Sequence, residues 1–242
     1  MFGLFQRKQS LIASGLLKDA VDNHSHILPG VDDGVRTLEE SLSILEYIEE
    51  QGFSTLWLTP HIMEDVPNTT EDLQQRFEAL CAAYSGKLKL RLAAEYMMDN
   101  LFEERLAAGD LLRHGGDQVL VETSTLFPPI GFWDLLETMK RSGYVPVLAH
   151  PERYRYMERK DYDRLRRGGV LLQLNIPSIV GAYGESVRDK ALMLLDRGMY
   201  AMVGSDCHRG RSIRRWYSDP VLKKDTLGKL RAVMAGMPEV ID

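Results

Sequence analysis

The chain has 242 residues with a formal net charge of −5 at pH 7, 44% apolar residues and 27% charged residues. This balance is typical of a soluble globular protein and excludes a disordered chain or one embedded in a membrane. The negative net charge also argues against general nucleic-acid binding, so nucleic acid is not expected as a partner. The two cysteines, Cys81 and Cys207, stand far apart outside any CxxC pair, which predicts a reducing, cytoplasmic location without a disulfide framework.

The first nineteen residues contain a faint imitation of a secretory signal, in which Arg7 and Lys8 precede an apolar run over 11–17. We expect no signal peptide, because the run is short and broken and no small-residue cleavage site follows it. We also expect no membrane span, since no apolar run approaches the ~18 residues that one requires. Residues 1–19 are therefore predicted to be an N-terminal extension that packs outside the main domain or at a subunit contact.

Short apolar runs alternate with longer amphipathic ones from residue 20 onward, which is typical of βα units that feed a parallel sheet. We predict seven strands, of which the first leads into His24 and the others span 53–59, 87–94, 118–122, 145–149, 170–174 and 199–203. Helices are predicted at 37–52, 69–84, 100–108, 132–142, 161–167 and 185–197. A last helix is predicted to open at Asp219 and Pro220, because Asp caps helices and Pro suits their first turn.

Histidines and acids gather at the carboxyl ends of the predicted strands. They are His24, His26, His61, Glu95, Glu122, His150, Asn175, Asp206 and His208. In a barrel of parallel strands these ends share one face, which is where barrel enzymes place their active sites. Five of the six histidines therefore converge, and His114 is the exception.

The segment from Asp22 to Gly34 has the pattern of a metal site. His24 and His26 are one residue apart, so both side chains point the same way from an extended segment. A turn at Pro29-Gly30 would let Asp32 or Asp33 fold back toward them. Taken alone, the motif would fit a pair of solvated loop histidines equally well. The convergence of the other strand ends favours the metal site.

The number of potential ligands exceeds what one ion with four to six positions can use, so we predict two or three ions. Imidazole and carboxylate ligands without thiolate suit manganese, iron or zinc better than calcium or copper(I). Clustered divalent ions hydrolyse phosphate esters, because they generate hydroxide and stabilise the attacking and leaving oxygens. The predicted ligands are His24, His26, Asp33, His61, Glu95, Glu122, His150, Asp206 and His208.

Five motifs carry a resemblance to a known family, namely His24-Ser25-His26 with Asp33, Thr59-Pro60-His61, Glu95, His150-Pro151-Glu152-Arg153 and Ser205-Asp206-Cys207-His208. Together they resemble the motifs of the PHP (polymerase and histidinol phosphatase) superfamily. More narrowly, HSHILPGVDDG, LTPH and HPERY are similar to the bacterial manganese-dependent protein-tyrosine phosphatases encoded with capsule and exopolysaccharide genes. The resemblance runs from about Asp22 to His208.

The resemblance implies an α/β fold, a distorted TIM-like (β/α)7 barrel with outer helices, as a single domain over residues 20–242. It also implies three ions. One would be held by His24, His26, Glu95 and Asp206. A second would share Glu95 and add Glu122 and His150. The third would take Asp33, His61 and His208.

Arg153 matches the family's phosphate-binding arginine, and a guanidinium suits a phosphoryl group because it pairs two oxygens at once. The alternative for Arg153 is a surface ion pair with Glu152 or Glu158. The family pattern also has an arginine beyond the last histidine, and Arg211 and Arg214 are both candidates for this substrate-binding position.

The implied function is that of a metal-dependent phosphatase that removes phosphate from tyrosine in a protein, the tail of a tyrosine kinase that controls polysaccharide export. A cysteine mechanism would place an arginine six residues after the nucleophile, but position 213 is Ile213, so Cys207 is interpreted as a small filler between ligands. A small-molecule phosphatase, such as a histidinol-phosphate phosphatase, and a non-catalytic regulatory barrel remain alternatives. The sequence leaves the oligomeric state open.

Overall fold

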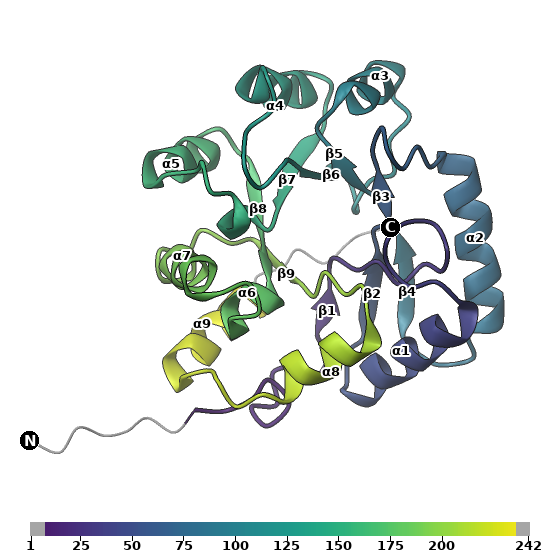
Figure 1. Ribbon diagram of the computed structural model, residues 1–242, viewed down its shortest axis with the longest axis vertical. Helices are drawn as coiled ribbons and strands as arrows, with labels where there is room; N and C mark the ends of the chain where they lie inside the picture. Colours follow the sequence, from purple (N-terminus) through teal and green to yellow (C-terminus); the bar gives the residue numbers. More distant parts are fainter. Residues whose placement is uncertain (1–7, 236–242) are drawn as a thin grey trace, which may run out of the picture.

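Short parallel strands line the centre of the molecule and helices surround them (Figure 1). The structure is a computed structural model that describes residues 8–235. Its described strands are β1 (Val21–Asp22), β2 (Thr55–Leu58), β3 (His61–Ile62), β4 (Lys89–Leu92), β5 (Glu95–Met97), β6 (Gln118–Glu122), β7 (Val145–Ala149), β8 (Leu171–Asn175) and β9 (Met202–Gly204). The larger helices are α1 (Leu38–Glu50), α2 (Thr70–Ala83), α3 (Asn100–Ala108), α4 (Phe132–Arg141), α5 (Arg159–Arg167), α7 (Glu185–Asp196), α8 (Gly210–Ser218) and α9 (Lys224–Ala235).

Two of the predicted strands, 53–59 and 87–94, are each followed beyond their predicted ends by a second short strand, β3 and β5. The strands form two parallel sheets, in the orders β1-β2-β4 and β3-β5-β6-β7-β8-β9. The break between β2 and β3 falls at Pro60, which has no N–H for a sheet hydrogen bond. Since β2 pairs with β4 and β3 pairs with β5, each broken strand continues in the same place, and the seven predicted strand positions are kept.

Hydrogen bonds between the first and last strands close the ring. The N–H of Asn23 donates to Val203 O at 3.2 Å, and the N–H of Asp206 donates to His24 O at 2.7 Å. With the helices outside, these contacts confirm the predicted distorted TIM-like barrel. The closed ring has a seam between β4 and β6, which do not pair with each other, because β6 pairs with β5. There the Trp57 ring stacks on buried His114, with ring centroids 4.1 Å apart.

Most predicted helices form close to their expected ends. Thr37 caps α1 by accepting a hydrogen bond from the N–H of Glu40, as the sequence pattern predicts. α5 starts before the predicted residue 161, because Glu158 and Asp161 form a reciprocal capping box. Near the active face, the 3-10 helix η1 (Pro151–Arg153) and the short helix α6 (Ile176–Val180) follow β7 and β8 directly.

The prediction that the last helix opens at Asp219 and Pro220 is wrong. Asp219 instead ends α8, and α9 begins only at Lys224. The reason is a tertiary contact: Leu222 exchanges two backbone hydrogen bonds with Gln9, at 2.8 and 3.1 Å. This bridge between distant segments holds the chain extended where the local signals favoured a helix.

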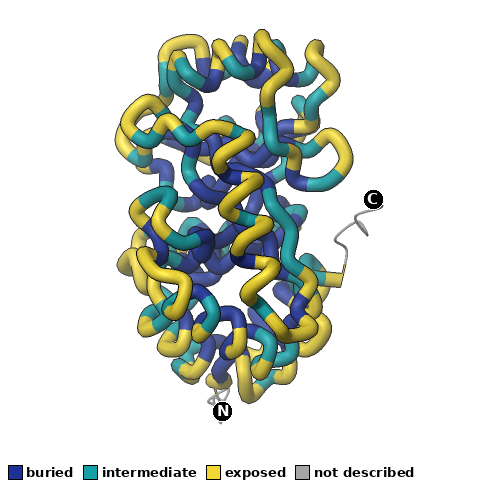
Figure 2. The backbone as a smooth tube through the Cα atoms, turned by 90° about the vertical axis from the view of Figure 1, so that its right-hand side faces the viewer, coloured by how far each residue is buried: buried dark blue, intermediate teal, exposed yellow. Residues whose placement is uncertain are grey.

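The described part of the predicted extension packs into the core. Leu11, Leu16 and Leu17 are buried and belong to the same apolar cluster as the helix and strand residues of the barrel. Figure 2 shows the buried segments at the centre of the molecule, under a surface of exposed turns. Residues 1–7 of the extension lie outside the described residues. Within residues 8–235 we find no helix that is both long and apolar enough to cross a membrane.

Candidate metal centre

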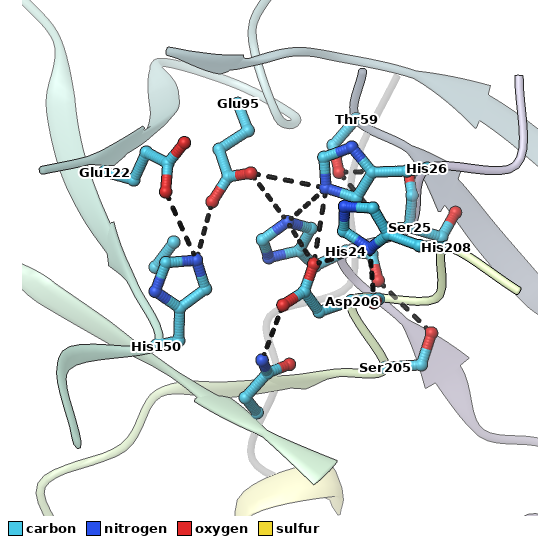
Figure 3. Close-up of polar contacts among 12 residues, drawn as sticks. His24, Ser25, His26, Thr59, Glu95, Glu122, His150, Ser205, Asp206 and His208 are labelled. Atoms are coloured by element: carbon cyan, nitrogen blue, oxygen red, sulfur yellow. Dashed lines mark hydrogen bonds and ion pairs between the residues drawn. The ribbon is translucent and has the colours of Figure 1, made fainter. Parts of the chain in front are cut away.

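All nine residues predicted as metal ligands lie together at the carboxyl ends of the strands, seven of them labelled in Figure 3. They form four overlapping groups, and the ligand atoms within each group are no more than 4.8 Å apart. The groups are His26, Asp33, His61 and His208; His24, Glu95 and His150; His24, His26 and Asp206; and His61, Glu95 and Glu122. Shared members join the groups into one cluster of adjacent sites.

The HxH segment is held extended by its neighbours on both sides. Ser25 pairs in parallel with Cys207, and its carbonyl oxygen accepts a hydrogen bond from the N–H of Thr59 at 2.8 Å. His24 and His26 therefore point to the same side, and their Nε2 atoms are 3.0 Å apart. Two nitrogens that bind one ion at ~2.1 Å and at a right angle lie about 3 Å apart, so this pair fits a transition-metal ion.

Glu95 is the carboxylate at the centre of the cluster. It is fully buried, and its Oε2 atom lies 3.1 Å from His24 Nε2, 3.3 Å from His26 Nε2 and 3.2 Å from His61 Nδ1. Its Oε1 atom lies 2.9 Å from His150 Nε2. Oε2 has no well-oriented hydrogen-bond donor despite its burial. A buried carboxylate oxygen in this position fits a bridging ligand, because a cation would satisfy it.

The remaining ligands surround this centre. Glu122 lies 3.2 Å from His61 Nδ1 and 3.6 Å from His150 Nε2. On the solvent side, Asp33 Oδ1 lies 3.3 Å from His208 Nε2 and 3.6 Å from His61 Nε2. The Asp33 side chain is 73% exposed, so this is the open edge of the cluster.

Two of the predicted ligands have backbone angles that residues other than glycine rarely adopt. His150 has φ 33° and Asp206 has φ 50°, although neither is glycine. His150 directly follows the end of β7, and Asp206 lies shortly after the end of β9. Such strain costs about 1–3 kcal/mol per residue and is concentrated at functional sites, where the fold holds a side chain in place.

Asp206 connects the ligand cluster to Arg153. Arg153 Nη1 lies 3.1 Å from Asp206 Oδ2, and the side-chain amide of Asn175 donates to the same oxygen at 2.8 Å. The acids considered as surface partners of Arg153 are engaged elsewhere. Glu152 is buried and accepts a hydrogen bond from the N–H of Asn175 at 3.0 Å, and Glu158 pairs with Lys160 at 3.0 Å.

Two residues outside the nine predicted ligands support the histidines: Asp32, which the sequence offered as an alternative to Asp33, and Gln173, which it did not indicate as a site residue. Asp32 Oδ2 lies 2.8 Å from His26 Nδ1 and accepts the N–H of His61 at 3.0 Å. Gln173 Oε1 lies 3.0 Å from His24 Nδ1 and accepts the N–H of His150 at 3.2 Å. Because these oxygens accept hydrogen bonds from Nδ1 of His26 and of His24, the Nε2 atom of each ring is free to bind metal. A glutamine in the middle of the apolar run Leu171 to Leu174 was the available signal.

The charges of the cluster are balanced internally. Burial lowers the pKa of His24, but Glu95 and Asp206 outweigh this effect and raise it to about 9. Burial would raise the pKa of Glu95, yet the positive charge of His24 and the hydrogen bond to His150 bring it well below its usual value. Asp206 follows the same pattern, with His24 opposing the effect of burial. Metal ions would therefore replace protons that the histidines carry.

The arginines after His208 lie in different surroundings. Arg209 Nη1 donates to three backbone carbonyl oxygens, those of Asp33 at 2.8 Å, His208 at 2.7 Å and Gly34. The Arg214 guanidinium stacks over Tyr47 at 4.1 Å, on the α1 side. Arg211 lies in the first turn of α8 and is exposed. The substrate-binding role of Arg211 and Arg214 stays a prediction.

Cys207 is inaccessible. It is fully buried behind the two neighbouring ligands, and burial, reinforced by the charge of Asp22, raises the pKa of its thiol. A thiol nucleophile needs the opposite, an accessible group with a lowered pKa. The interpretation of Cys207 as a filler agrees with this environment.

Known proteins with similar sequences carry tyrosine phosphatase names. The chain is 26% identical over 196 residues to tyrosine-protein phosphatase YwqE of Bacillus subtilis (strain 168), covering 78% of this chain and 77% of that protein. It is 28% identical over 207 residues to tyrosine-protein phosphatase CpsB of Streptococcus agalactiae serotype V, covering 78% and 82%.

Solved structures and a family model agree with this fold. A structure from the metal-dependent tyrosine phosphatases YwqE of Bacillus subtilis and CpsB of Streptococcus pneumoniae aligns with 90% of this chain and 88% of its own, with a TM-score of 0.75 and 24% identity. The family model for capsular polysaccharide synthesis, CpsB/CapC, matches residues 20–221, which include every predicted ligand. The chain therefore belongs to the CpsB/CapC family of capsular polysaccharide synthesis.

Proposed function

We propose that this protein is a metal-dependent phosphomonoester hydrolase that dephosphorylates phosphotyrosine on a protein. The observation that carries the proposal is the convergence of nine histidine, aspartate and glutamate side chains, with buried Glu95 at their centre and Arg153 at their edge. The relatives named tyrosine-protein phosphatases support the choice of substrate.

Manganese is the proposed metal, with iron or zinc as alternatives and two or three ions per chain. Glu95 would bridge, because both of its oxygens face imidazole nitrogens and one lacks a hydrogen bond. When bound, the ions would supply a hydroxide at neutral pH and positive charge for the transferred phosphoryl group. The proposed sets follow the family resemblance and are His24, His26, Glu95 and Asp206; Glu95, Glu122 and His150; and Asp33, His61 and His208.

The accessible edge of the cluster sets the direction from which a phosphate ester can approach. His24, His26 and Glu95 are fully buried, whereas the side chains of Asp33 and Arg153 are 73% and 28% exposed. The phosphoryl group would enter on this side, and the donors of Arg153 that Asp206 does not use would bind its oxygens. A phosphotyrosine reaches farther from a peptide backbone than a phosphoserine, so the buried ligands favour it.

The proposed substrate protein is a tyrosine kinase that controls capsule or exopolysaccharide production, through its phosphorylated tail. We place the enzyme in the cytoplasm, where free cysteines such as Cys81 and Cys207 stay reduced. Nucleic acid is not a proposed partner, because the net charge is −5.

Kinetics on three substrates would test this function. The manganese-loaded protein should hydrolyse a phosphotyrosine peptide faster than its phosphoserine counterpart and faster than histidinol phosphate. A chelator should abolish turnover and manganese should restore it, while Cys207→Ser and Cys81→Ser keep activity. A preference for histidinol phosphate would replace the proposal with a small-molecule phosphatase. Inactivity on every ester, with metal bound, would favour a non-catalytic regulatory barrel.

A further inference from the structure

An aromatic ring covers the guanidinium of Arg153. Tyr183 lies after α6, and the Arg153 Cζ atom is 4.7 Å from the centroid of its ring. Gly181 and Gly184 flank the tyrosine, each with φ 89°, a left-handed conformation that suits glycine. The chain therefore turns sharply on both sides of Tyr183. This ring has no role in the proposed set of ligands.

The guanidinium is restrained in two directions. Nη1 pairs with Asp206 Oδ2 at 3.1 Å, and Asn175 donates to the same oxygen at 2.8 Å. Tyr183 adds a contact over the planar face of the group, where an aromatic ring attracts a cation. Because Asp206 holds one edge of the guanidinium and Tyr183 covers its face, the remaining N–H groups have a fixed orientation.

The position of Tyr183 does not suit a residue whose only role is core packing. Tyr183 is 38% exposed, whereas Tyr154, which directly follows Arg153 in the sequence, is fully buried. Burial and the charge of Asp206 also raise the pKa of the Tyr183 hydroxyl, so the side chain stays a neutral phenol. A neutral, partly exposed ring beside the metal cluster suits a contact with a cation.

We propose that Tyr183 is a positioning residue that holds the Arg153 guanidinium in the orientation that binds phosphoryl oxygens. The inference deepens the proposed function and rests on it, because Arg153 must be the phosphate-binding arginine. The stacked ring would reduce the entropy that Arg153 loses when phosphate binds, so its removal should weaken phosphate binding without removing any phosphate contact.

The primary test measures binding of inorganic phosphate to the manganese-loaded protein by isothermal titration calorimetry. Tyr183→Ala should weaken phosphate binding about tenfold, the scale of a partly desolvated cation–π contact. Tyr183→Phe keeps the ring and should stay within about twofold of the wild type. Arg164→Ala is the matched control, because it removes another stacked pair, with Trp133 at 3.8 Å, from between α4 and α5. It should leave phosphate affinity unchanged.

A double-mutant cycle separates positioning from general damage. In an Arg153→Ala background, Tyr183→Ala should cause no further loss of phosphate affinity. Equal losses in both backgrounds would overturn the inference, as would an unchanged affinity in Tyr183→Ala alone. The Arg153 side-chain ¹⁵N–¹H resonances report the stack directly, and they should lose their ring-current shift in Tyr183→Ala and keep it in Tyr183→Phe.

Turnover distinguishes this inference from the proposed function. If the wild type binds phosphate through Arg153 and Tyr183 but hydrolyses no phosphate ester, the phosphatase proposal fails and the positioning role stands. If the wild type hydrolyses phosphotyrosine peptides and Tyr183→Ala leaves KM, kcat and phosphate affinity unchanged, only the positioning role fails. Metal content, measured by elemental analysis, should be the same in all variants.

Discussion

Single residues behind the ligands determine how the histidines face the metal cluster. Gln173 on β8 contacts two of them, because its Oε1 atom lies 3.0 Å from His24 Nδ1 and 3.2 Å from the backbone N of His150. Its side-chain amide donates to Leu174 O at 2.6 Å, which fixes which end of the amide faces the rings. One neutral side chain therefore orients ligands from two proposed ion sites.

Replacement of Gln173 should weaken metal binding. Gln173→Leu removes the acceptor at His24 Nδ1, so the ring can rotate or carry its proton on Nε2, and we expect manganese affinity to fall about 10- to 100-fold. Calorimetric titration of metal-free protein would measure the change. Gln173→Glu retains an acceptor at the same place and should lose less. Equal affinity in Gln173→Leu and the wild type would show that other contacts hold the ring.

The residue types of the cluster could be predicted from sequence, but not all of their roles. His24, His61, Glu95 and His150 each follow a predicted strand, so their convergence needs only the barrel topology. Asp32 and Asp33 are adjacent after the same turn, and their roles depend on the turn geometry. Asp32 accepts the N–H of Gly34 at 2.8 Å and faces His26, which directs Asp33 toward His208. No local pattern contains that information.

At the level of elements, hydrogen bonds hold the loop that carries Asp33 against the segment between β9 and α8. Arg209 donates to the carbonyl oxygens of Asp33 at 2.8 Å and of Gly34, and it directly precedes α8. Gly34 approaches His26 so closely that an added Cβ would meet His26 O at 2.1 Å. The exposed ligand Asp33 therefore depends on a contact from a distant segment.

Loss of the hydrogen bonds from Arg209 should first affect the proposed ion site that is most exposed. Arg209→Ala frees the loop, so we expect elemental analysis after dialysis to find about one ion fewer per chain, because Asp33 no longer stays beside His61 and His208. Arg215→Ala is the control, since Arg215 is exposed and pairs only at 3.3 Å with Asp219. If Arg209→Ala bound as many ions per chain as the wild type, Arg209 would not be needed to hold the Asp33 loop in place.

The sequence patterns missed the helices α6 and α8 and misplaced the start of α9. The strands were predictable because buried parallel strands have short apolar runs, as in Val119-Leu120-Val121. The helix α6 has five residues and starts directly from the end of β8, so it is too short for a periodic pattern. The delayed start of α9 reflects the bridge between Gln9 and Leu222, which joins the N-terminal segment to the segment before α9.

For the whole molecule, the seam of the barrel contains a buried histidine away from the metal cluster. His114 Nε2 donates a hydrogen bond to Asn23 O at 2.8 Å, because a carbonyl oxygen can only accept, so the ring carries its proton on Nε2. Burial lowers the pKa of His114 from 6.5 to about 4. As the pH falls, His114 is therefore protonated near pH 6.5 in the unfolded chain but only near pH 4 in the folded protein.

Acid should therefore destabilise the protein through His114. Its contribution is fully present above pH 6.5 and is lost as the pH falls toward 4, because only the unfolded state gains the proton. At pH 4.5 the loss should be about 2–3 kcal/mol. Urea unfolding of chelated His114→Gln and wild type at pH 7.5 and 4.5 would measure it. The variant should lose less stability than the wild type, and parallel losses would contradict this assignment.

The contacts of the N-terminal segment help to define where the folded domain begins. We propose that the barrel domain starts at residue 20 and that the preceding residues are an extension, yet Leu11 and Leu17 contact the common core. The N–H of Ile12 donates to Tyr217 O at 3.1 Å, and Gln9 pairs with Leu222. An extension with these contacts contributes to the stability of the barrel from outside its strands.

Neighbouring residues of this segment provide a matched test. Leu11 is 2% exposed, so Leu11→Ala should lower the free energy of unfolding by about 2–5 kcal/mol, the cost of a cavity in a packed core. Ile12 is 40% exposed, so Ile12→Ala should change it by no more than about 0.5 kcal/mol. Because both substitutions shorten an aliphatic side chain at adjacent positions, the difference isolates burial from chain chemistry. Urea unfolding of the manganese-loaded protein would measure both. Equal, small effects would mean that the segment lies on the barrel without being part of its cooperative unit.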